Sequence, residues 1–242
     1  MSTFGLVHGG FHGAWCWERV IPLLTARGHA AVAMDLPSDD PDATLSDYVA
    51  AVVDALVAVE EPVILVGHSM GGLVIPHVAR FRPVARLVFI CAMFDNLPPS
   101  APGAGLPGVT RSAFDMSSLT VDDRVTSISA ERAAAAFYGD CEPADVEWAV
   151  ARLRSQGHAP ATPLVAPWPD VPSSVITCTD DRSRDFTRLV VAPRLGVEPI
   201  ELPGGHSPFL SRPGELANVL AGIADARGSA PVVDGVSPGS VR

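Results

Sequence analysis

The chain has 242 residues, and its 17 Lys+Arg and 27 Asp+Glu give a formal net charge of −10. All of the basic residues are arginines, because the sequence contains no lysine. This excludes the lysine-dependent P-loop, pyridoxal-phosphate enzymes and Schiff-base aldolases. The acidic balance argues against nucleic-acid binding, which needs clustered positive charge. We therefore expect a small, neutral or apolar substrate and no nucleic-acid partner.

The composition is typical of one globular domain. Hydrophobic residues make up 48% of the chain and charged residues 18%, which excludes a disordered protein, and α/β folds of this length are commonly undivided. No C-x-x-C pair occurs, so we expect neither a zinc site nor a disulfide framework but reduced, buried thiols at Cys16, Cys91, Cys141 and Cys178. The N-terminus lacks a positive segment before its apolar stretch, and no apolar run approaches the ~18 residues of a membrane span. We expect a cytoplasmic protein without a membrane partner, whose oligomeric state stays open, a homodimer included.

Short apolar runs alternate with helix-like stretches along the chain. The strands are predicted at residues 4–8, 30–35, 62–67, 86–93, 174–179 and 197–202. Helices are predicted at 15–27, 46–59, 70–80, 184–195 and 213–227, with Ser46 as a helix cap and Pro213 in a first helical turn. Near-continuous Val, Ile, Leu and Ala in several strands indicate burial on both faces. The alternation predicts an α/β fold, with a mostly parallel six-stranded sheet covered by helices on both sides.

One connection is much longer than an ordinary crossover. Residues 95–173 contain no sheet-like run, but they carry helical stretches near 130–137 and 143–155 and are bracketed by prolines. Such an excursion from a regular sheet is typical of a cap over a site. We therefore predict a core of residues 1–94 and 174–227, a cap or lid of residues 95–173, and a flexible tail of residues 228–242.

The strongest motif is G-x-S-x-G, formed by Gly67, Ser69 and Gly71. It stands between a predicted buried strand and a predicted helix, where a sharp turn exposes the serine and the helix N-terminus favours a developing oxyanion. The alternative is a structural turn rich in glycine. We predict that Ser69 is a nucleophile.

A serine hydroxyl needs a base, and the base needs an acid that orients it. His206 lies in a loop just after the last predicted strand, although it could also be a solvated loop residue. Asp181 follows the strand at 174–179 and is our choice of acid, while Asp180 and Asp95 remain candidates. The order of serine, aspartate and histidine is that of the α/β-hydrolases.

Two backbone amides are expected to form the oxyanion hole. Met70 N–H directly follows the nucleophile, and Gly10 lies in a glycine-rich loop after the first strand, which could also be a simple turn. For the walls of the substrate site we select four aromatic residues: Phe11, Phe94, Phe137 and Trp148. No cofactor or metal is expected, because the G-x-G-x-x-G at residues 103–108 contains Pro107 and no H-E-x-x-H or comparable ligand spacing occurs.

Several segments resemble one known family. Residues 6–17, 63–72 and 178–181, with Phe137-Tyr138 and Cys141-Glu142-Pro143, are similar to the plant methylesterase and hydroxynitrile lyase family of α/β-hydrolases. The resemblance implies the triad and oxyanion donors named above, and a sheet that begins at the strand of residues 4–8. The lyases of this family have a lysine directly after the catalytic histidine, where this chain has Ser207, and a threonine where it has Gly9. The resemblance therefore implies the esterase branch, with the acid alignment open between Asp180 and Asp181.

These features together predict a serine carboxylesterase that cleaves a small, largely apolar ester or lactone through an acyl-enzyme on Ser69. Two alternatives remain. The same scaffold could perform lyase, C–C hydrolase or perhydrolase chemistry, because residues around the triad decide which species is bound. It could also bind a ligand without turnover.

Overall fold

A computed structural model describes residues 1–94, 120–122, 125–157 and 168–226 of the chain. Its main sheet has six strands in the order β2-β1-β3-β4-β8-β9, and every neighbouring pair is parallel. The strands are β1 (Thr3–Val7), β2 (Ala30–Met34), β3 (Val63–His68), β4 (Val84–Ile90), β8 (Ser173–Cys178) and β9 (Ile200–Leu202). The predicted α/β architecture with a six-stranded sheet is confirmed.

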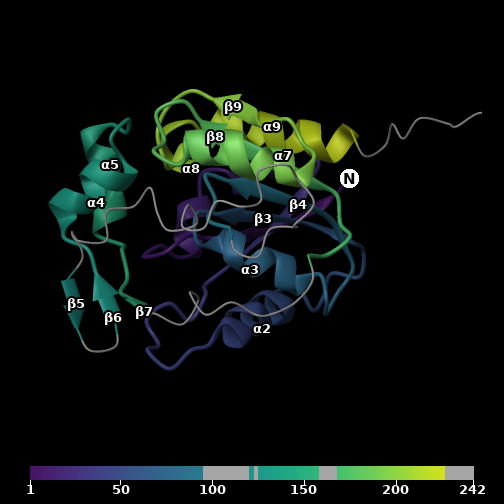
Figure 1. Ribbon diagram of the computed structural model, residues 1–242, viewed down its shortest axis with the longest axis horizontal. Coiled ribbons are helices and arrows are strands. Elements are labelled where there is room, and N and C mark those ends of the chain that lie inside the picture. Colours follow the sequence, from purple (N-terminus) through teal and green to yellow (C-terminus); the bar gives the residue numbers. More distant parts are fainter. Residues whose placement is uncertain (95–119, 123–124, 158–167, 227–242) are drawn as a thin grey trace, which may run out of the picture.

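Helices cover both faces of this sheet, and alternate residues of each strand face opposite helical layers. In β3, Ile64 and Val66 belong to one buried cluster, whereas Val63 and Leu65 belong to the other. The first cluster includes residues of α1 (Ile21–Thr25), α8 (Pro208–Ser211) and α9 (Pro213–Asp225); the second includes residues of α2 (Leu45–Ala55) and α3 (Gly71–Val78). Figure 1 shows α2 and α3 on one side of the sheet and α9 on the other. Burial on both faces explains the continuous apolar runs.

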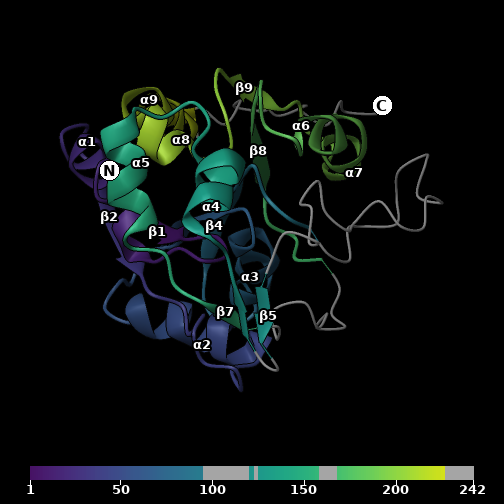
Figure 2. The ribbon, with the colours of Figure 1, turned by 90° about the vertical axis from the view of Figure 1, so that its left-hand side faces the viewer.

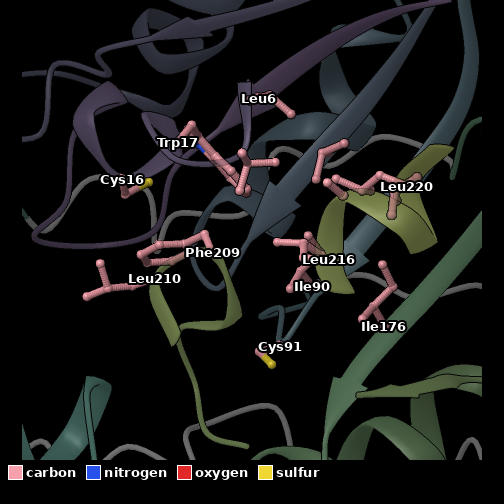
Figure 3. Packing of buried hydrophobic residues seen from close by; sticks show 14 of the residues in the cluster. Leu6, Cys16, Trp17, Ile90, Cys91, Ile176, Phe209, Leu210, Leu216 and Leu220 are labelled. Carbon is pink, nitrogen blue, oxygen red and sulfur yellow. The ribbon is translucent and has the colours of Figure 1, made fainter. Parts of the chain in front are cut away.

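The loop and short helix before α9 are anchored in the first cluster. Phe209 of α8 is fully buried and packs 5.6 Å from the ring of Trp17 (Figure 3). Leu216 and Leu220 of α9 belong to the same cluster, as does Ile90 of β4 (Figure 3). Because α8 directly follows the loop that carries His206, this packing fixes one end of that loop.

Three local predictions need correction. The predicted helix at 15–27 is a 3₁₀ helix, η1 (Ala14–Trp17), followed by α1. The predicted helix at 184–195 is α6 (Arg184–Phe186), a π-helical turn (Thr187–Val191) and α7 (Ala192–Leu195). The cap of α2 is Thr44 rather than Ser46: Thr44 Oγ1 accepts from Asp47 N–H at 3.4 Å, and the Asp47 carboxylate accepts from Thr44 N–H at 2.7 Å. A reciprocal pair of this kind satisfies two free amides, which Ser46 at the second helical position cannot do.

The described part of the long connection contains α4 (Ala130–Phe137) and α5 (Pro143–Val150), close to prediction. The prediction that it has no sheet was wrong. Strands β5 (Thr120–Asp122), β6 (Val125–Ser127) and β7 (Gln156–Gly157) form an antiparallel sheet in the order β5-β6-β7. Strands of two or three residues are too short to give a periodic signal. Figures 1 and 2 show these helices and strands together beside one end of the main sheet.

Among the residues that the structure describes, no helix is both long and apolar enough to cross a membrane.

Candidate active site

The residues predicted to act together lie where parallel strands end. Gly10 follows β1, Ser69 follows β3, Asp181 follows β8 and His206 follows β9. Because parallel strands point the same way, the loops at their carboxyl ends meet at one edge of the sheet, which is the usual ligand side of such folds. The topology therefore brings four segments far apart in sequence to one edge.

Ser69 occupies a strained turn between β3 and α3. Its φ angle is 48°, in the left-handed region that residues with a side chain rarely adopt. Three backbone hydrogen bonds hold this conformation. Ser69 N–H donates to Ile90 C=O at 3.0 Å, and Ser69 C=O accepts from Gly72 N–H at 3.0 Å and from Met93 N–H at 2.8 Å. The surrounding strand and helix thus impose the geometry of a nucleophile elbow.

The glycines of the motif are required by close backbone packing. A Cβ atom at Gly67 would lie 2.7 Å from the carbonyl oxygen of Gly71, and one at Gly71 would lie 2.7 Å from that of Val7. Contacts this short with backbone atoms cannot be relieved by a rotamer change. The G-x-S-x-G spacing therefore lets β3, α3 and the end of β1 approach one another closely enough to form the turn.

His206 and Asp181 form a buried hydrogen-bonded pair. His206 Nδ1–H donates to Asp181 Oδ1 at 2.8 Å, and the two side chains are 12% and 4% exposed. The other carboxylate oxygen, Oδ2, accepts from the hydroxyl of Ser183. Burial alone would raise the pKa of Asp181, but the hydrogen bond and proximity of His206, with the Ser183 hydroxyl and the Cys91 thiol, lower it below its ordinary value. The carboxylate is therefore ionised at neutral pH.

The structure thus brings one of the three acid candidates to His206. Asp180 is exposed, and its backbone N–H donates to Gly204 C=O at 2.9 Å, which fixes the turn between the two loops. The third candidate, Asp95, lies outside the described residues.

The second ring nitrogen of His206 is left available. His206 Nε2 is buried and makes no hydrogen bond to any group in the described part of the chain. The ring is covered by Phe137, whose ring centroid lies 5.8 Å away at an interplanar angle of 29°, and by His68 at 4.9 Å. His68 Nε2–H donates to the backbone carbonyl of His206 at 2.9 Å. His68 therefore helps to place the His206 loop.

The loop after β1 presents the Gly10 amide away from the groups that anchor it. Gly9 C=O accepts from His8 Nδ1–H at 2.8 Å and from His12 N–H at 3.3 Å. The N–H of Gly10 belongs to the same trans peptide and points the opposite way. Neither this amide nor that of Met70 donates to a group in the described residues. Both are therefore free to bind an oxyanion.

The same loop closely approaches the nucleophile. A Cβ atom at Gly9 would lie 2.9 Å from the Cβ of Ser69 and 2.8 Å from His68 Nδ1. The side chain of Met70 lies next to Gly10, because a Cβ at Gly10 would be 3.9 Å from the Met70 sulfur. The two amides predicted for the oxyanion hole thus lie on adjacent segments.

The four aromatic residues predicted for the substrate walls do not all gather at the site. Phe11 is buried, with its ring centroid 6.1 Å from that of Phe137, and Phe137 covers His206. Phe94 instead packs 4.8 Å from Phe89, in the cluster on the α2 and α3 side of the sheet. Trp148 packs edge-on against Trp15 at 5.2 Å, with the Arg152 guanidinium 4.4 Å from its ring centroid. Phe11 and Phe137 are therefore the two whose positions fit a substrate wall.

Cys91 is a member of this site that sequence reasoning did not single out. It follows β4, has φ 44°, and contributes to the lowered pKa of Asp181. Its sulfur, a carboxylate oxygen of Asp181 and a ring nitrogen of His206 lie within 4.8 Å of one another, a set that could also ligate a metal ion. His206 and Asp181 are already bonded to each other, so Cys91 is a third member of the cluster that holds this pair. Its position directly after a central strand is the signal that could have found it.

Comparison with known proteins gives the family. The model described as the alpha/beta hydrolase family matches residues 6–219. The chain belongs to the alpha/beta hydrolase family. Among relatives of this hydrolase, the pyrethroid hydrolase of Sphingobium wenxiniae is 30% identical over 91% of this chain and 87% of its own length. The probable esterase PIR7A of Oryza sativa subsp. indica is 30% identical over 91% of this chain and 96% of its own.

Solved structures agree with the family. The crystal structure of a pyrethroid hydrolase from Sphingobium faniae matches this hydrolase with a TM-score of 0.75 and 27% identity, over 94% of this chain and 98% of that one. The predicted family and fold class are thus confirmed.

Proposed function

We propose that the protein is a serine carboxylesterase with Ser69 as nucleophile, His206 as base and Asp181 as the acid that orients it. The observation that carries the proposal is the His206 Nδ1–Asp181 Oδ1 hydrogen bond of 2.8 Å, which leaves His206 Nε2 without a partner in the described residues. An imidazole held in this tautomer by a carboxylate is prepared to accept a proton at Nε2.

In the proposed reaction, Ser69 Oγ attacks the acyl carbon while His206 Nε2 takes its proton. Asp181 stabilises the imidazolium, which then protonates the departing alcohol. The amides of Gly10 and Met70 bind the oxyanion, an interaction that typically lowers the barrier by about 3 kcal/mol for each donor. Water then attacks the acyl-enzyme with His206 as base and releases the acid. In the absence of substrate, catalytic hydrogen bonds to the nucleophile are often not yet formed.

The substrate we propose is a small, largely apolar ester or lactone. Phe11 and Phe137 supply apolar surface next to His206, and the net charge of −10 disfavours anionic substrates. The relatives named esterases and hydrolases support the same class of reaction. We also propose that the segment of α4, α5 and β5–β7 acts as a cap, because Phe137 at the end of α4 covers the His206 ring.

Location in the cytoplasm is a further part of the proposal. The four cysteines are free in the structure, and Cys141 is half-buried while the other three are buried. Free thiols are typical of proteins in reducing compartments.

A matched pair of enzymes tests this function. Wild type and Ser69→Ala would be assayed on p-nitrophenyl esters of increasing acyl length and on γ- and δ-lactones. The expected result is turnover by wild type and its loss, by at least about 10³-fold, in Ser69→Ala. Equal turnover by both proteins would refute the assignment. A fluorophosphonate probe should label wild type at Ser69 and leave the variant unlabelled.

The alternative chemistries are distinguished by products. Cyanohydrin cleavage is disfavoured, because Ser207 follows His206, is fully buried, and no lysine exists elsewhere in the chain. Mandelonitrile and a β-diketone, run beside the esters, would reveal lyase or C–C hydrolase activity. Tight ligand binding without labelling or turnover would favour a binding protein instead.

A further inference from the structure

The segment that carries α4, α5 and β7 holds the peptide unit between Gly10 and Phe11, directly at its amide and through His12 at its carbonyl. Its carbonyl, Gly10 C=O, accepts from His12 Nδ1–H at 2.7 Å. Its amide, Phe11 N–H, donates to Gln156 Oε1 at 3.4 Å. His12 is in turn bonded to Tyr138 at 2.8 Å, and both Tyr138 and Gln156 come from the inserted segment.

The His12 ring is held between the Gly10 carbonyl and the Tyr138 hydroxyl. The ring is almost fully buried, and burial lowers the pKa of His12 to about 3, so the imidazole is neutral at physiological pH. A neutral imidazole has one donor and one acceptor. Because Gly10 C=O can only accept, the proton resides on Nδ1, and Nε2 accepts from the Tyr138 hydroxyl, which anchors the ring in this position.

Gln156 is oriented in a similar way. Its Nε2 donates to the Tyr48 hydroxyl at 2.9 Å and to Gly157 C=O at 2.9 Å, so Oε1 faces the Phe11 amide. The carbonyl of Phe11 accepts from Arg154 N–H at 2.8 Å. The short stretch of residues 154–156 therefore holds both backbone polar groups of Phe11.

These bonds oppose a local strain. Phe11 has φ 65°, a left-handed conformation that is unfavourable for a residue with a large side chain, and such conformations persist only where the surroundings impose them. Without the bonds, rotation of the Gly10–Phe11 peptide would return Phe11 to negative φ. Because that rotation turns about ψ of Gly10, the bonds also restrain the residue whose amide is the proposed oxyanion donor.

We propose that Tyr138 and Gln156 are positioning residues that hold the oxyanion loop from the inserted segment, Tyr138 through His12 and Gln156 through Phe11. This inference rests on the proposed function. It gives the inserted segment a role in the rate of reaction at the acyl carbon, in addition to any contact with substrate.

The test compares Tyr138→Phe, Gln156→Met and the control Asp145→Asn. Tyr138→Phe removes the bond to His12, and Gln156→Met removes the bond to Phe11 N–H together with those to Tyr48 and Gly157, both at nearly constant volume. Asp145 bonds Arg19 at 2.8 Å and so also joins α5 to the core, but it does not touch the oxyanion loop. For each protein one would measure kcat and KM on the best ester, the inhibition constant of a trifluoromethyl ketone, and the melting temperature.

Each positioning variant is expected to lower kcat by about 10- to 100-fold, less than the 10²- to 10³-fold loss for removal of a whole oxyanion donor. KM should stay within about twofold. The inhibition constant of the ketone should rise by the same factor as kcat falls, since its bound hemiketal oxyanion uses the same amides. The Asp145→Asn control should stay within about twofold of wild type in all three values. In the double variant the losses should be less than multiplicative, because both contacts hold one peptide.

The positioning role would be overturned if Tyr138→Phe and Gln156→Met kept the kcat and the ketone affinity of wild type. The proposed function would still stand in that case, provided that Ser69→Ala had lost ester turnover. An equal loss in Asp145→Asn would also overturn it, because docking of the whole segment would then explain the effect. If Gln156→Met fails to fold, Tyr138→Phe alone decides the outcome. Turnover that survives Ser69→Ala would instead refute the proposed function itself.

Discussion

Three buried imidazoles near the active site predict that the free energy of unfolding falls strongly as the pH is lowered. His8, His12 and His68 are each at most 1% exposed. Burial is the largest cause that lowers their pKa, to about 4 for His8, to about 3 for His12 and well below the ordinary value of 6.5 for His68. In the unfolded chain these groups take up protons as pH falls through about 6.5, whereas in the folded chain they stay neutral. Stability is therefore complete above about pH 6.5 and decreases below it.

The magnitude follows from the linkage relation. Between pH 7.5 and 5.0 each such histidine should lower the free energy of unfolding by about 2 kcal/mol, so the three together should lower it by about 6 kcal/mol. This is comparable to the whole stability of a typical domain, about 5–15 kcal/mol. For a chain of this length, 1 kcal/mol corresponds to about 2–4 °C in melting temperature. We therefore expect a decrease of roughly 12–24 °C over this range.

Thermal melts followed by circular dichroism at half-unit pH steps would measure this decrease. In His8→Gln the melting temperature should decrease by about one third less than in wild type. Each protein is compared with its own melting temperature at pH 7.5. A melting temperature constant to about 2 °C between pH 7.5 and 5.0 would refute the reasoning, as would an unchanged slope in His8→Gln. Carboxylates such as Asp181, whose pKa lies below its ordinary value, titrate below this range and do not contribute to it.

The remaining predictions concern the site. Asp181→Asn should lower kcat by about 10⁴-fold, as loss of the orienting acid does in other triads. The kcat of Asp180→Asn should stay within about threefold of wild type. The reverse result would assign the acid to Asp180. Gly9→Thr should abolish ester turnover, because its Cβ would lie 2.9 Å from the Ser69 Cβ; retained labelling by a fluorophosphonate would contradict this. Ellman's reagent should react slowly with the native protein and rapidly with four thiols in urea. Burial raises the pKa of Cys16 and raises that of half-buried Cys141 to about 12, so little of the reactive thiolate is present in the folded protein.

The main sheet could be predicted from sequence because its strands are buried on both faces. Residues 63–66 face helices on either side, so all four are apolar and the strand is unambiguous. The loops after such strands must meet at one edge, which is why the position of Ser69 and His206 followed from strand assignments alone. The small sheet β5-β6-β7 gave no such signal, because its strands have three, three and two residues.

Contacts between distant segments could not be read from the sequence. The Tyr138–His12 bond joins residues 126 positions apart, and the Gln156–Phe11 bond joins residues 145 positions apart. Nothing in the local pattern around Gln156 distinguishes it from a polar loop residue. The same holds for Cys91, whose relation to Asp181 depends on the pairing of β4 with β8.

The structure also explains why one histidine among four neighbours is suited to be the base. His8 uses Nδ1 for Gly9 C=O and Nε2 for Leu36 N–H at 3.0 Å, and His12 likewise uses both nitrogens. His68 donates Nε2–H to a backbone carbonyl and has a pKa well below its ordinary value, first of all because it is buried. His206 alone of these four pairs with a carboxylate while its other nitrogen has no partner in the described residues. The neutral rings of His8, His12 and His68 are therefore structural, and they hold the loops around His206. His206 is the one of the four whose protonated form would be stabilised by a neighbouring carboxylate.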